Sequence, residues 1–132
     1  MSIFEKFKLG LSKSSRSLSS GLDDLFFKRK IDENTLNELK KLSKLPNIYA
    51  KLTSGTHGSP RIFPHEDMHD PLKKVIDFFS PERCLWGSNF PNKLWSKGTT
   101  YKENLSLFTE ELGLSNYEKN SILYKTSKSL WF

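Results

Sequence analysis

The residues most capable of chemistry, Ser88 and Asn89, stand where a short apolar segment ends. Residues 84–86 are Cys, Leu and Trp, Gly87 follows them, and Pro91 ends any further backbone pairing. A continuous apolar run of this kind is typical of a buried parallel strand. In parallel α/β folds, ligands bind at the carboxyl ends of such strands. The sequence therefore predicts that Ser88 and Asn89 belong to a catalytic site.

Other reactive side chains near this segment have simpler interpretations. Cys84 lies inside the apolar run, which favours a buried small hydrophobe over a nucleophile. Ser88 lacks the second glycine that a nucleophile elbow requires. Lys51 either points into the mouth of a ligand site or forms a salt bridge, and a lone lysine more often does the latter.

Three histidines, His57, His65 and His69, fall in a loop with several carboxylates. Their spacings of eight and four residues permit a metal site, but they match no compact zinc pattern. Solvated loop histidines are the favoured interpretation, and no metal ligand is assigned. The neighbouring oxygen donors are Glu66, Asp67 and Asp70.

The second part of the chain alternates predicted strands and helices. Residues 47–53 and 83–86 are predicted strands, and we expect them to pair in parallel. Between them, Asp70 as N-cap and Pro71 at the first helical position predict a helix over 71–79. A crossover of this length suits a right-handed βαβ unit. Its predicted buried stripe is Leu72, Val75, Ile76 and Phe79.

Two capping boxes predict the last helices. Thr100 with Glu103 opens a helix that ends at Gly113, and Ser115 with Glu118 opens another. The order strand, helix, strand, helices is that of a parallel α/β fold. Because two strands do not usually make a stable sheet, we expect self-association or completion by further strands. The predicted buried residues of the 101–112 helix are Leu105, Phe108 and Leu112.

Length and composition limit the function classes. The 132 residues carry a net charge of +6, and residues 1–44 hold 10 basic against 6 acidic side chains. One cysteine excludes an internal disulfide and favours a reducing cytoplasm. The chain has neither a secretory signal pattern nor an apolar run long enough to span a membrane. The short basic cluster at 28–30 does not suffice to predict nucleic-acid binding.

The first third of the chain is predicted to be a basic amphipathic helical arm. Phe4, Phe7 and Leu11 form an apolar stripe, and Lys8 lies among them. Such a helix binds an anionic membrane surface, binds a partner protein, or packs on its own domain. A later helix of this arm begins after Asp32 as N-cap and runs to about residue 44.

The arm resembles the start of the N-domain of the bacterial signal recognition particle receptor. The resemblance rests on FKLGLSKS at 7–14, SGLDDLF at 20–26 and KIDENTLNEL at 30–39. It covers about residues 1–41 and implies peripheral attachment to the inner face of the membrane. The phosphate-binding loop Gly-x-x-x-x-Gly-Lys-Ser/Thr occurs nowhere in the chain, so the resemblance does not extend to GTPase activity.

Residues 42–132 resemble the amidohydrolase-related metal-dependent hydrolases. The matching segments are LPNIYAKLT at 45–53, HEDMHDPL at 65–72 and PERCLWGSNFP at 81–91, together with the tail from 101 to 131. The resemblance implies an α/β fold: the last two βα units of an incomplete (β/α)8 barrel. It also implies hydrolysis of lactone or amide substrates.

The resemblance identifies Asn89 with a position where this family usually has aspartate. That aspartate serves the metal-bound water, whereas an amide cannot accept a proton. The resemblance also includes members with asparagine at this position, which leaves metal-independent lactone chemistry open. The family's divalent metal has no recognisable ligands in this sequence. The expectation is therefore a composite chain: an arm over 1–44 and a barrel fragment over 45–132, joined as in a rearranged reading frame. We expect little hydrolase activity from the chain alone, and the rival function is a docking module.

Overall fold

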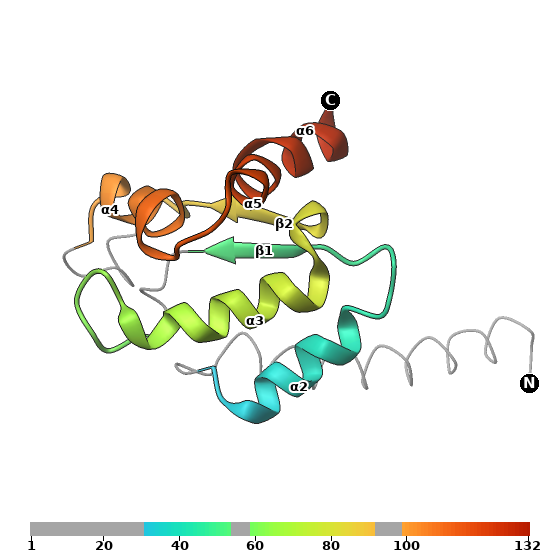
Figure 1. Cartoon of the computed structure of the whole chain (residues 1–132), viewed down its shortest axis with the longest axis horizontal. Helices are drawn as coiled ribbons and strands as arrows, with labels where there is room; N and C mark the ends of the chain where they lie inside the picture. Colours follow the sequence, from blue (N-terminus) through green and yellow to red (C-terminus); the bar gives the residue numbers. More distant parts are fainter. Residues whose placement is uncertain (1–30, 54–58, 92–98) are drawn as a thin grey trace, which may run out of the picture.

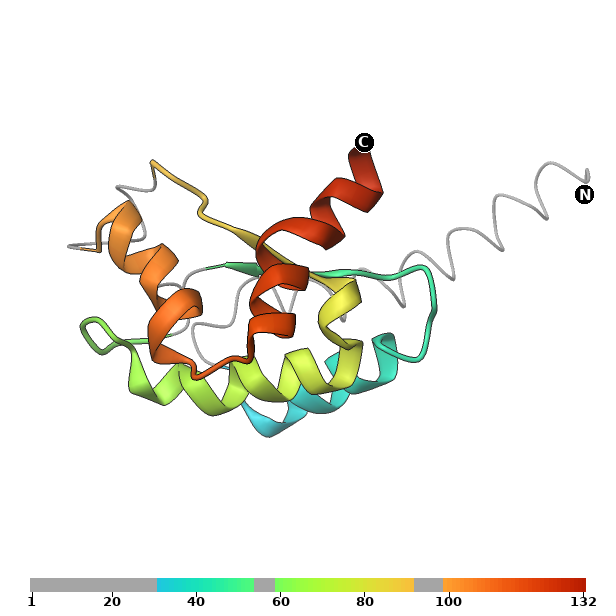
Figure 2. The ribbon, with the colours of Figure 1, turned by 45° about the horizontal axis from the view of Figure 1, so that its top comes forward.

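The computed structural model describes residues 31–53, 59–91 and 99–132. Its centre is a two-stranded sheet, β1 (Ala50–Thr53) beside β2 (Cys84–Gly87). Helix α3 (His69–Phe79) connects the strands and lies between the sheet and α2 (Glu33–Leu42), as Figure 1 and Figure 2 show. The helices that follow β2 pack on the sheet from another side (Figure 2).

The strands are parallel, as the sequence predicted, although each is displaced from its predicted bounds. Ala50 pairs with Cys84 and Thr53 with Gly87, so both strands end at the same edge. The α/β class and the crossover by α3 are thus confirmed. β1 begins three residues later than predicted, and β2 runs one residue further, to Gly87.

The predicted start of α3 was wrong in detail. The helix begins at His69, with Met68 as N-cap and no side-chain cap, so Asp70 and Pro71 lie inside its first turn. The Asp70 carboxylate still interacts favourably with the positive end of the helix dipole in this first turn. A single 3-10 turn, η2 (Glu66–Met68), leads into the helix and moves its start upstream. The predicted stripe is buried throughout: Leu72, Val75, Ile76 and Phe79.

Both capping boxes are present. They open α4 (Tyr101–Ser106) and α5 (Asn116–Asn120), and each continues into a π-helical segment, η4 (Leu107–Glu111) and η5 (Ser121–Lys125). Because a π-helical segment shifts the register of the helix surface, Leu107 is buried and Leu105 is only half-buried. Gly113 ends this stretch with φ of +63°, as predicted. The chain finishes with α6 (Thr126–Trp131).

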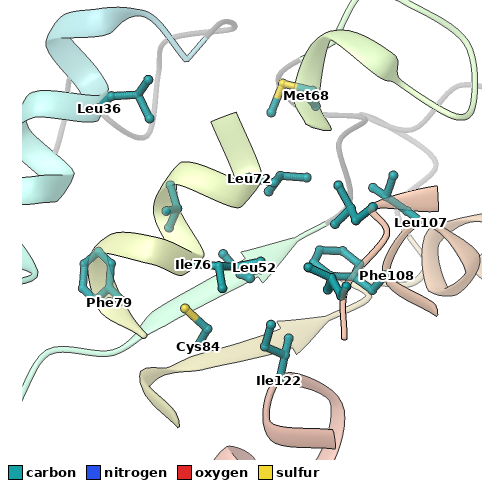
Figure 3. Close-up of a cluster of buried hydrophobic side chains, with 13 residues drawn as sticks. Leu36, Leu52, Met68, Leu72, Ile76, Phe79, Cys84, Leu107, Phe108 and Ile122 are labelled. Atoms are coloured by element: carbon teal, nitrogen blue, oxygen red, sulfur yellow. The ribbon is translucent and has the colours of Figure 1, made fainter. Parts of the chain in front are cut away.

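The core lies between the sheet, α3 and the later helices. Cys84 is fully buried there beside Ile76 and Ile122 (Figure 3), which confirms its role as a small hydrophobe. Aromatic side chains provide much of the packed volume, because Phe79 and Phe108 have almost no exposed surface. The core has the following further members: Leu36, Leu52, Met68, Leu72, Val75, Leu107, Leu112 and Leu114.

Helix α2 packs against α3, although the sequence assigned its residues to the arm. Asp32 is its N-cap, as predicted, and accepts a hydrogen bond from the Thr35 backbone N–H at 2.8 Å. Leu36 is a member of the core. The apolar residues predicted for membrane or partner contact, Phe4, Phe7 and Leu11 with Lys8, lie outside the described residues. Within the described part, no helix has the length and apolar character needed to cross a membrane.

Candidate functional site

The carboxyl ends of the two strands bring Lys51 and Asn89 together. Lys51 Nζ donates a hydrogen bond of 2.7 Å to Asn89 Oδ1, although the residues are 38 positions apart. Lys51 comes from β1, and Asn89 follows β2 by two residues. Sequence reasoning predicted the site at Asn89 and gave Lys51 two alternatives, a position in the mouth of the barrel or, as the more common role of a lone lysine, a salt bridge. Among the described residues, the partner of Lys51 is this amide and not a carboxylate.

The strand register explains this contact. Lys51 pairs with Leu85, so its side chain lies on the same sheet face as that of Leu85 and of position 87. Position 87 is glycine, and a Cβ there would lie 2.3 Å from Lys51 Cε. The lysine side chain therefore crosses the strand through the space that Gly87 leaves open. Glycine permits this close approach because it has no side chain.

The backbone after β2 turns sharply. Asn89 has φ of +50°, a left-handed conformation that asparagine adopts more readily than most residues. Ser88 Oγ accepts a hydrogen bond of 3.2 Å from the Phe90 backbone N–H. Ser88 is half-buried, and no described histidine or carboxylate hydrogen-bonds its hydroxyl. Among the described residues, Ser88 therefore has no base that would activate it as a nucleophile.

Aromatic rings gather beside Asn89. The Tyr101 ring meets Trp86 and Phe90 edge to face, with centroids 5.8 Å apart in both pairs. The Phe90 side chain is 59% exposed and Tyr101 is 45% exposed. Edge-to-face pairs are favourable because the ring edge is positive and the ring face is negative. The segment that follows β2 therefore carries exposed aromatic surface at Phe90, in contact with Tyr101 at the start of α4.

His65 and His69 both bond backbone carbonyl oxygens. His65 Nδ1 bonds the Arg61 carbonyl oxygen at 2.8 Å, and His69 Nε2 bonds the Pro64 carbonyl oxygen at 2.9 Å. The ring nitrogen that bonds the carbonyl carries the proton, which leaves the other nitrogen of each ring as an acceptor. His57 lies outside the described residues. Across the described ranges, no three His, Cys, Asp or Glu side chains are grouped as metal ligands.

Three buried polar atoms have no partner within the described part of the chain. They are His65 Nε2, Trp86 Nε1 and Asn104 Oδ1. His65 also has φ of +55° and is only 3% exposed. No sequence signal pointed to Asn104, because an asparagine inside a predicted helix normally faces solvent.

Two groups near the strands have displaced pKa values. Burial raises the pKa of the Cys84 thiol to about 12, so the thiol stays protonated and unreactive at neutral pH. The pKa of Glu103 lies below its ordinary value, first because the Thr100 backbone N–H donates to the carboxylate and then because the Thr100 hydroxyl does. Neither group is a general base at neutral pH: one is protonated, and the other is a weakly basic carboxylate within a helix cap.

Most of the chain matches a known protein family. The amidohydrolase family pattern matches residues 33–132. This chain belongs to the amidohydrolase family. The match begins at the first residue of α2, so it includes a helix that the sequence assigned to the arm.

A solved structure shares the fold. It is a crystal structure from Pseudomonas putida described as that of a 2-pyrone-4,6-dicarboxylic acid hydrolase. The TM-score is 0.63 at 22% identity, and the similarity covers 77% of this amidohydrolase-family chain. It covers only 37% of the Pseudomonas chain. At this identity the likeness establishes the fold.

A shorter stretch of the chain is similar to proteins of a second family. The chain is 52% identical over 42 residues to the signal recognition particle receptor FtsY of Rickettsia prowazekii, and 50% identical to that of Rickettsia typhi. The stretch is 32% of this chain and 14% of each receptor. The resemblances to both families predicted from sequence are therefore confirmed.

Proposed function

We propose that residues 45–132 form the last two βα units of an amidohydrolase barrel and have no hydrolase activity by themselves. The hydrogen bond from Lys51 to Asn89 carries this proposal. The acceptor of this hydrogen bond is the Asn89 amide oxygen, which lies at the strand end where the family usually has a carboxylate. Among the described residues, the site at the ends of these two strands has no group that would activate water.

The chemistry of hydrolysis explains the inactivity. Attack of water on a lactone or amide carbonyl needs a base that removes a proton from the water. An asparagine amide is not basic, and an ammonium is only a donor. Catalytic groups in barrel enzymes come from the ends of several strands. The described strands supply two such ends.

The divalent metal of the family does not fit the described residues. Asn89 Oδ1 already accepts from an ammonium, which repels a cation at the same oxygen. One ring nitrogen each of His65 and His69 bonds a carbonyl oxygen, and among the described residues no three His, Cys, Asp or Glu side chains are grouped as metal ligands. The described residues therefore support no catalytic step through a metal, which would need ligands from other strands.

An assay of the whole chain tests this proposal. We expect no hydrolysis of an aromatic lactone by the purified chain, with or without added Zn²⁺ or Mn²⁺, measured as acid release at constant pH. Asn89→Asp restores a carboxylate but not the other strands, so it should also be inactive. Turnover that purifies with the chain and disappears in Asn89→Ala would overturn the proposal.

We infer a second function for the arm, which the similarity to the receptors favours. Residues 1–20 dock on an anionic membrane, with Phe4, Phe7 and Leu11 inserted and Lys8 near the lipid headgroups. This would place the chain in the cytoplasm, at the inner face of the membrane. The attraction weakens with salt because ions screen the lysines from the lipid charge.

Vesicle sedimentation tests the arm. The chain should sediment with phosphatidylglycerol vesicles at low salt, less at high salt, and hardly with phosphatidylcholine vesicles. Phe7→Ser should reduce binding, and Ile62→Ser, at an exposed apolar position of the described part, is the matched control. Equal binding to both vesicle types, or no binding at low salt, would contradict membrane docking.

A partner at the sheet edges is also part of the proposal. Among the described residues, β1 and β2 pair only with each other. An unpaired strand edge is a template for further strands, so we expect self-association at high concentration. Sedimentation equilibrium would show it as an apparent mass that rises with concentration, and a constant monomer mass would exclude it.

A further inference from the structure

Helix α6 and the residues around it carry several exposed apolar side chains. Leu130 is exposed, Trp131 is 64% exposed, and Phe132 after them is fully exposed. Tyr124, near the end of η5, is 55% exposed. Single exposed apolar side chains are common on proteins, whereas several of them on one element indicate a surface that another molecule covers.

The inner face of this helical run holds it on the body of the chain. α5, η5 and α6 follow one another without a break. Ile122 is a member of the core, and Thr126 Oγ1 donates a hydrogen bond of 3.2 Å to the Pro81 carbonyl oxygen. Figure 1 and Figure 2 both show α6 on the side of the body opposite α2, projecting away from the sheet. The helix is thus fixed on one side and open on the other.

The outer face of α6 combines rings with lysines. Tyr124, Lys128 and Trp131 are spaced by four and three positions, which places them on one helix face. The contact between the first two agrees with this placement, since Lys128 Nζ lies 5.4 Å from the Tyr124 ring centroid. We define the outer face of α6 as these three residues with Lys125 and Leu130, all of which are exposed.

The positive charge of this face is not balanced by nearby carboxylates. Positions 119–132 contain three lysines and no aspartate or glutamate. Among the described residues, no carboxylate forms an ion pair with Lys125 or Lys128. The nearest carboxylate along the chain, Glu118, accepts hydrogen bonds from Ser115 in its capping box. The face therefore offers unpaired ammonium groups beside exposed rings.

This charge decides which partner fits the outer face of α6. A second copy of the chain would bring the same lysines toward each other. Residues 1–30 carry 7 basic against 3 acidic side chains, so the arm would be repelled as well. An anionic partner is complementary. Tryptophan and tyrosine rings suit the boundary between lipid headgroups and acyl chains, and lysines on the same helix reach the headgroups, so a lipid surface fits best.

We propose that the outer face of α6 docks on an anionic lipid bilayer, with Leu130 and Trp131 inserted at the headgroup boundary and Lys125 and Lys128 beside the lipid phosphates. The proposal goes beyond the proposed function, because it assigns a membrane contact to the part of the chain that matches the amidohydrolase family. It does not depend on docking by residues 1–20, which are a separate surface.

Vesicle sedimentation of the full chain tests this proposal in two backgrounds, wild type and Phe7→Ser, so that the arm and α6 are separated. In both, Trp131→Ser should weaken binding to phosphatidylglycerol vesicles by about threefold or more, because an interfacial helix depends on its apolar side chains. Phe90→Ser is the matched control, since it removes an exposed ring outside α6 and should leave binding unchanged.

Lysine variants test the charge of the same face. Lys125→Gln/Lys128→Gln should weaken binding to phosphatidylglycerol vesicles and reduce its salt dependence, because fewer charges remain for the ions to screen. Lys44→Gln/Lys102→Gln removes the same charge at exposed positions outside α6 and should have the smaller effect. Equal effects of the two double variants would show that only net charge matters and would overturn docking by α6.

Fluorescence quenching tests whether the indole itself enters the bilayer. Brominated phosphatidylcholine mixed into phosphatidylglycerol vesicles should quench part of the tryptophan fluorescence of the bound chain. Trp131→Phe keeps an apolar ring, so it should still sediment with the vesicles but lose most of the quenched fluorescence. Equal quenching of the bound wild type and bound Trp131→Phe would place Trp131 outside the bilayer and overturn the proposal.

Other occupants of the face give different results. Vesicle binding that Trp131→Ser leaves unchanged in both backgrounds would overturn the proposal. In that case, a lower apparent mass of lipid-free Trp131→Ser at sedimentation equilibrium would assign the face to a second copy. Loss of binding to a single-stranded oligonucleotide in the same variant would assign it to a nucleic acid instead. Lactone turnover by the chain alone would overturn the proposed function and leave this inference in place.

Discussion

Arg83 donates from Nη2 to the Ser43 carbonyl oxygen at 2.8 Å, which ties the end of α2 to the start of β2. The same guanidinium donates to the Leu45 carbonyl at 2.9 Å and, through Nε, to the Phe79 carbonyl at 3.0 Å. Arginine suits this position because its planar fork offers five donors in fixed directions. The residue thus joins three chain segments: the turn after α2, the end of α3 and the entry to β2.

Replacing Arg83 by methionine should destabilise the chain by about 2 kcal/mol, because the carbonyls lose a charged donor and some of them are partly buried. Urea unfolding followed by circular dichroism measures this loss. Arg61→Met is the matched control. Arg61 forms an exposed ion pair of 3.6 Å with Glu66, so its loss should change the stability by less than about 0.5 kcal/mol. Equal effects of the two substitutions would contradict the role of Arg83.

The helices that follow β1 were largely predictable, because local sequence patterns determine their buried faces and their ends. The stripe on α3, the two capping boxes and the end at Gly113 each follow from residues within one or two turns. The start of α3 was not predictable in this way. Asp70-Pro71 is a strong local start signal, but the η2 turn supplies an earlier start at His69. The π-helical segments had no sequence signal either.

The position of Ser88 and Asn89 directly after a strand was predictable, but the partner of Asn89 was not. The end of an apolar run pointed to Ser88 and Asn89. The partner of Asn89 depends on the register of two strands separated by a helix, and no local pattern encodes a register. The one available signal was Gly87, since a glycine at the end of a strand often marks close approach by another group.

Gly87→Ala should disturb the hydrogen bond between Lys51 and Asn89 with little loss of stability. The new Cβ would meet the flexible end of Lys51, which can move aside, so we expect a stability loss below about 1 kcal/mol. The displaced lysine should no longer bond Asn89, so the Asn89 side-chain amide signals should shift in a ¹⁵N spectrum. Unchanged Asn89 signals in this variant would show that the path of Lys51 over Gly87 is unimportant for the hydrogen bond.

Gly113→Ala is the informative contrast to Gly87→Ala. An added Cβ at position 113 meets nothing within 4 Å, but the φ of +63° disfavours a side chain. The expected cost is about 1 kcal/mol from backbone strain alone. Urea unfolding should show this loss, while the Asn89 side-chain amide signals should remain as in the wild type. A stability equal to that of the wild type would argue against the left-handed conformation at Gly113.

The thiol of Cys84 should be inert in the folded chain. Its pKa of about 12 keeps it protonated at pH 8, and its side chain is fully buried in the core. Because the thiolate is the reactive form, Ellman's reagent should react slowly with the native chain. In 8 M urea the same cysteine, the single one in the sequence, should react rapidly. Rapid reaction of the native chain would mean that the β2 region opens readily.

The capping boxes predict how stability changes with pH. Hydrogen bonds from Thr100 hold the pKa of Glu103 below its ordinary value, and hydrogen bonds from Ser115 do the same for Glu118. In the unfolded chain each carboxyl returns to a pKa of about 4.3. The stabilisation is therefore complete above that unfolded value and is lost as the pH falls through the lower folded value. Both groups are largely exposed, so solvent screening keeps the effect small.

Glutamine variants test this pH dependence. The double variant Glu103→Gln/Glu118→Gln retains a side chain that can close each capping box but cannot titrate. Its urea midpoint should fall less than that of the wild type between pH 6 and pH 3. Glu110→Gln, at an exposed position in η4, is the control and should follow the wild-type curve. If the double variant loses stability as steeply as the wild type, other carboxylates cause the acid sensitivity and the capping boxes contribute little to it.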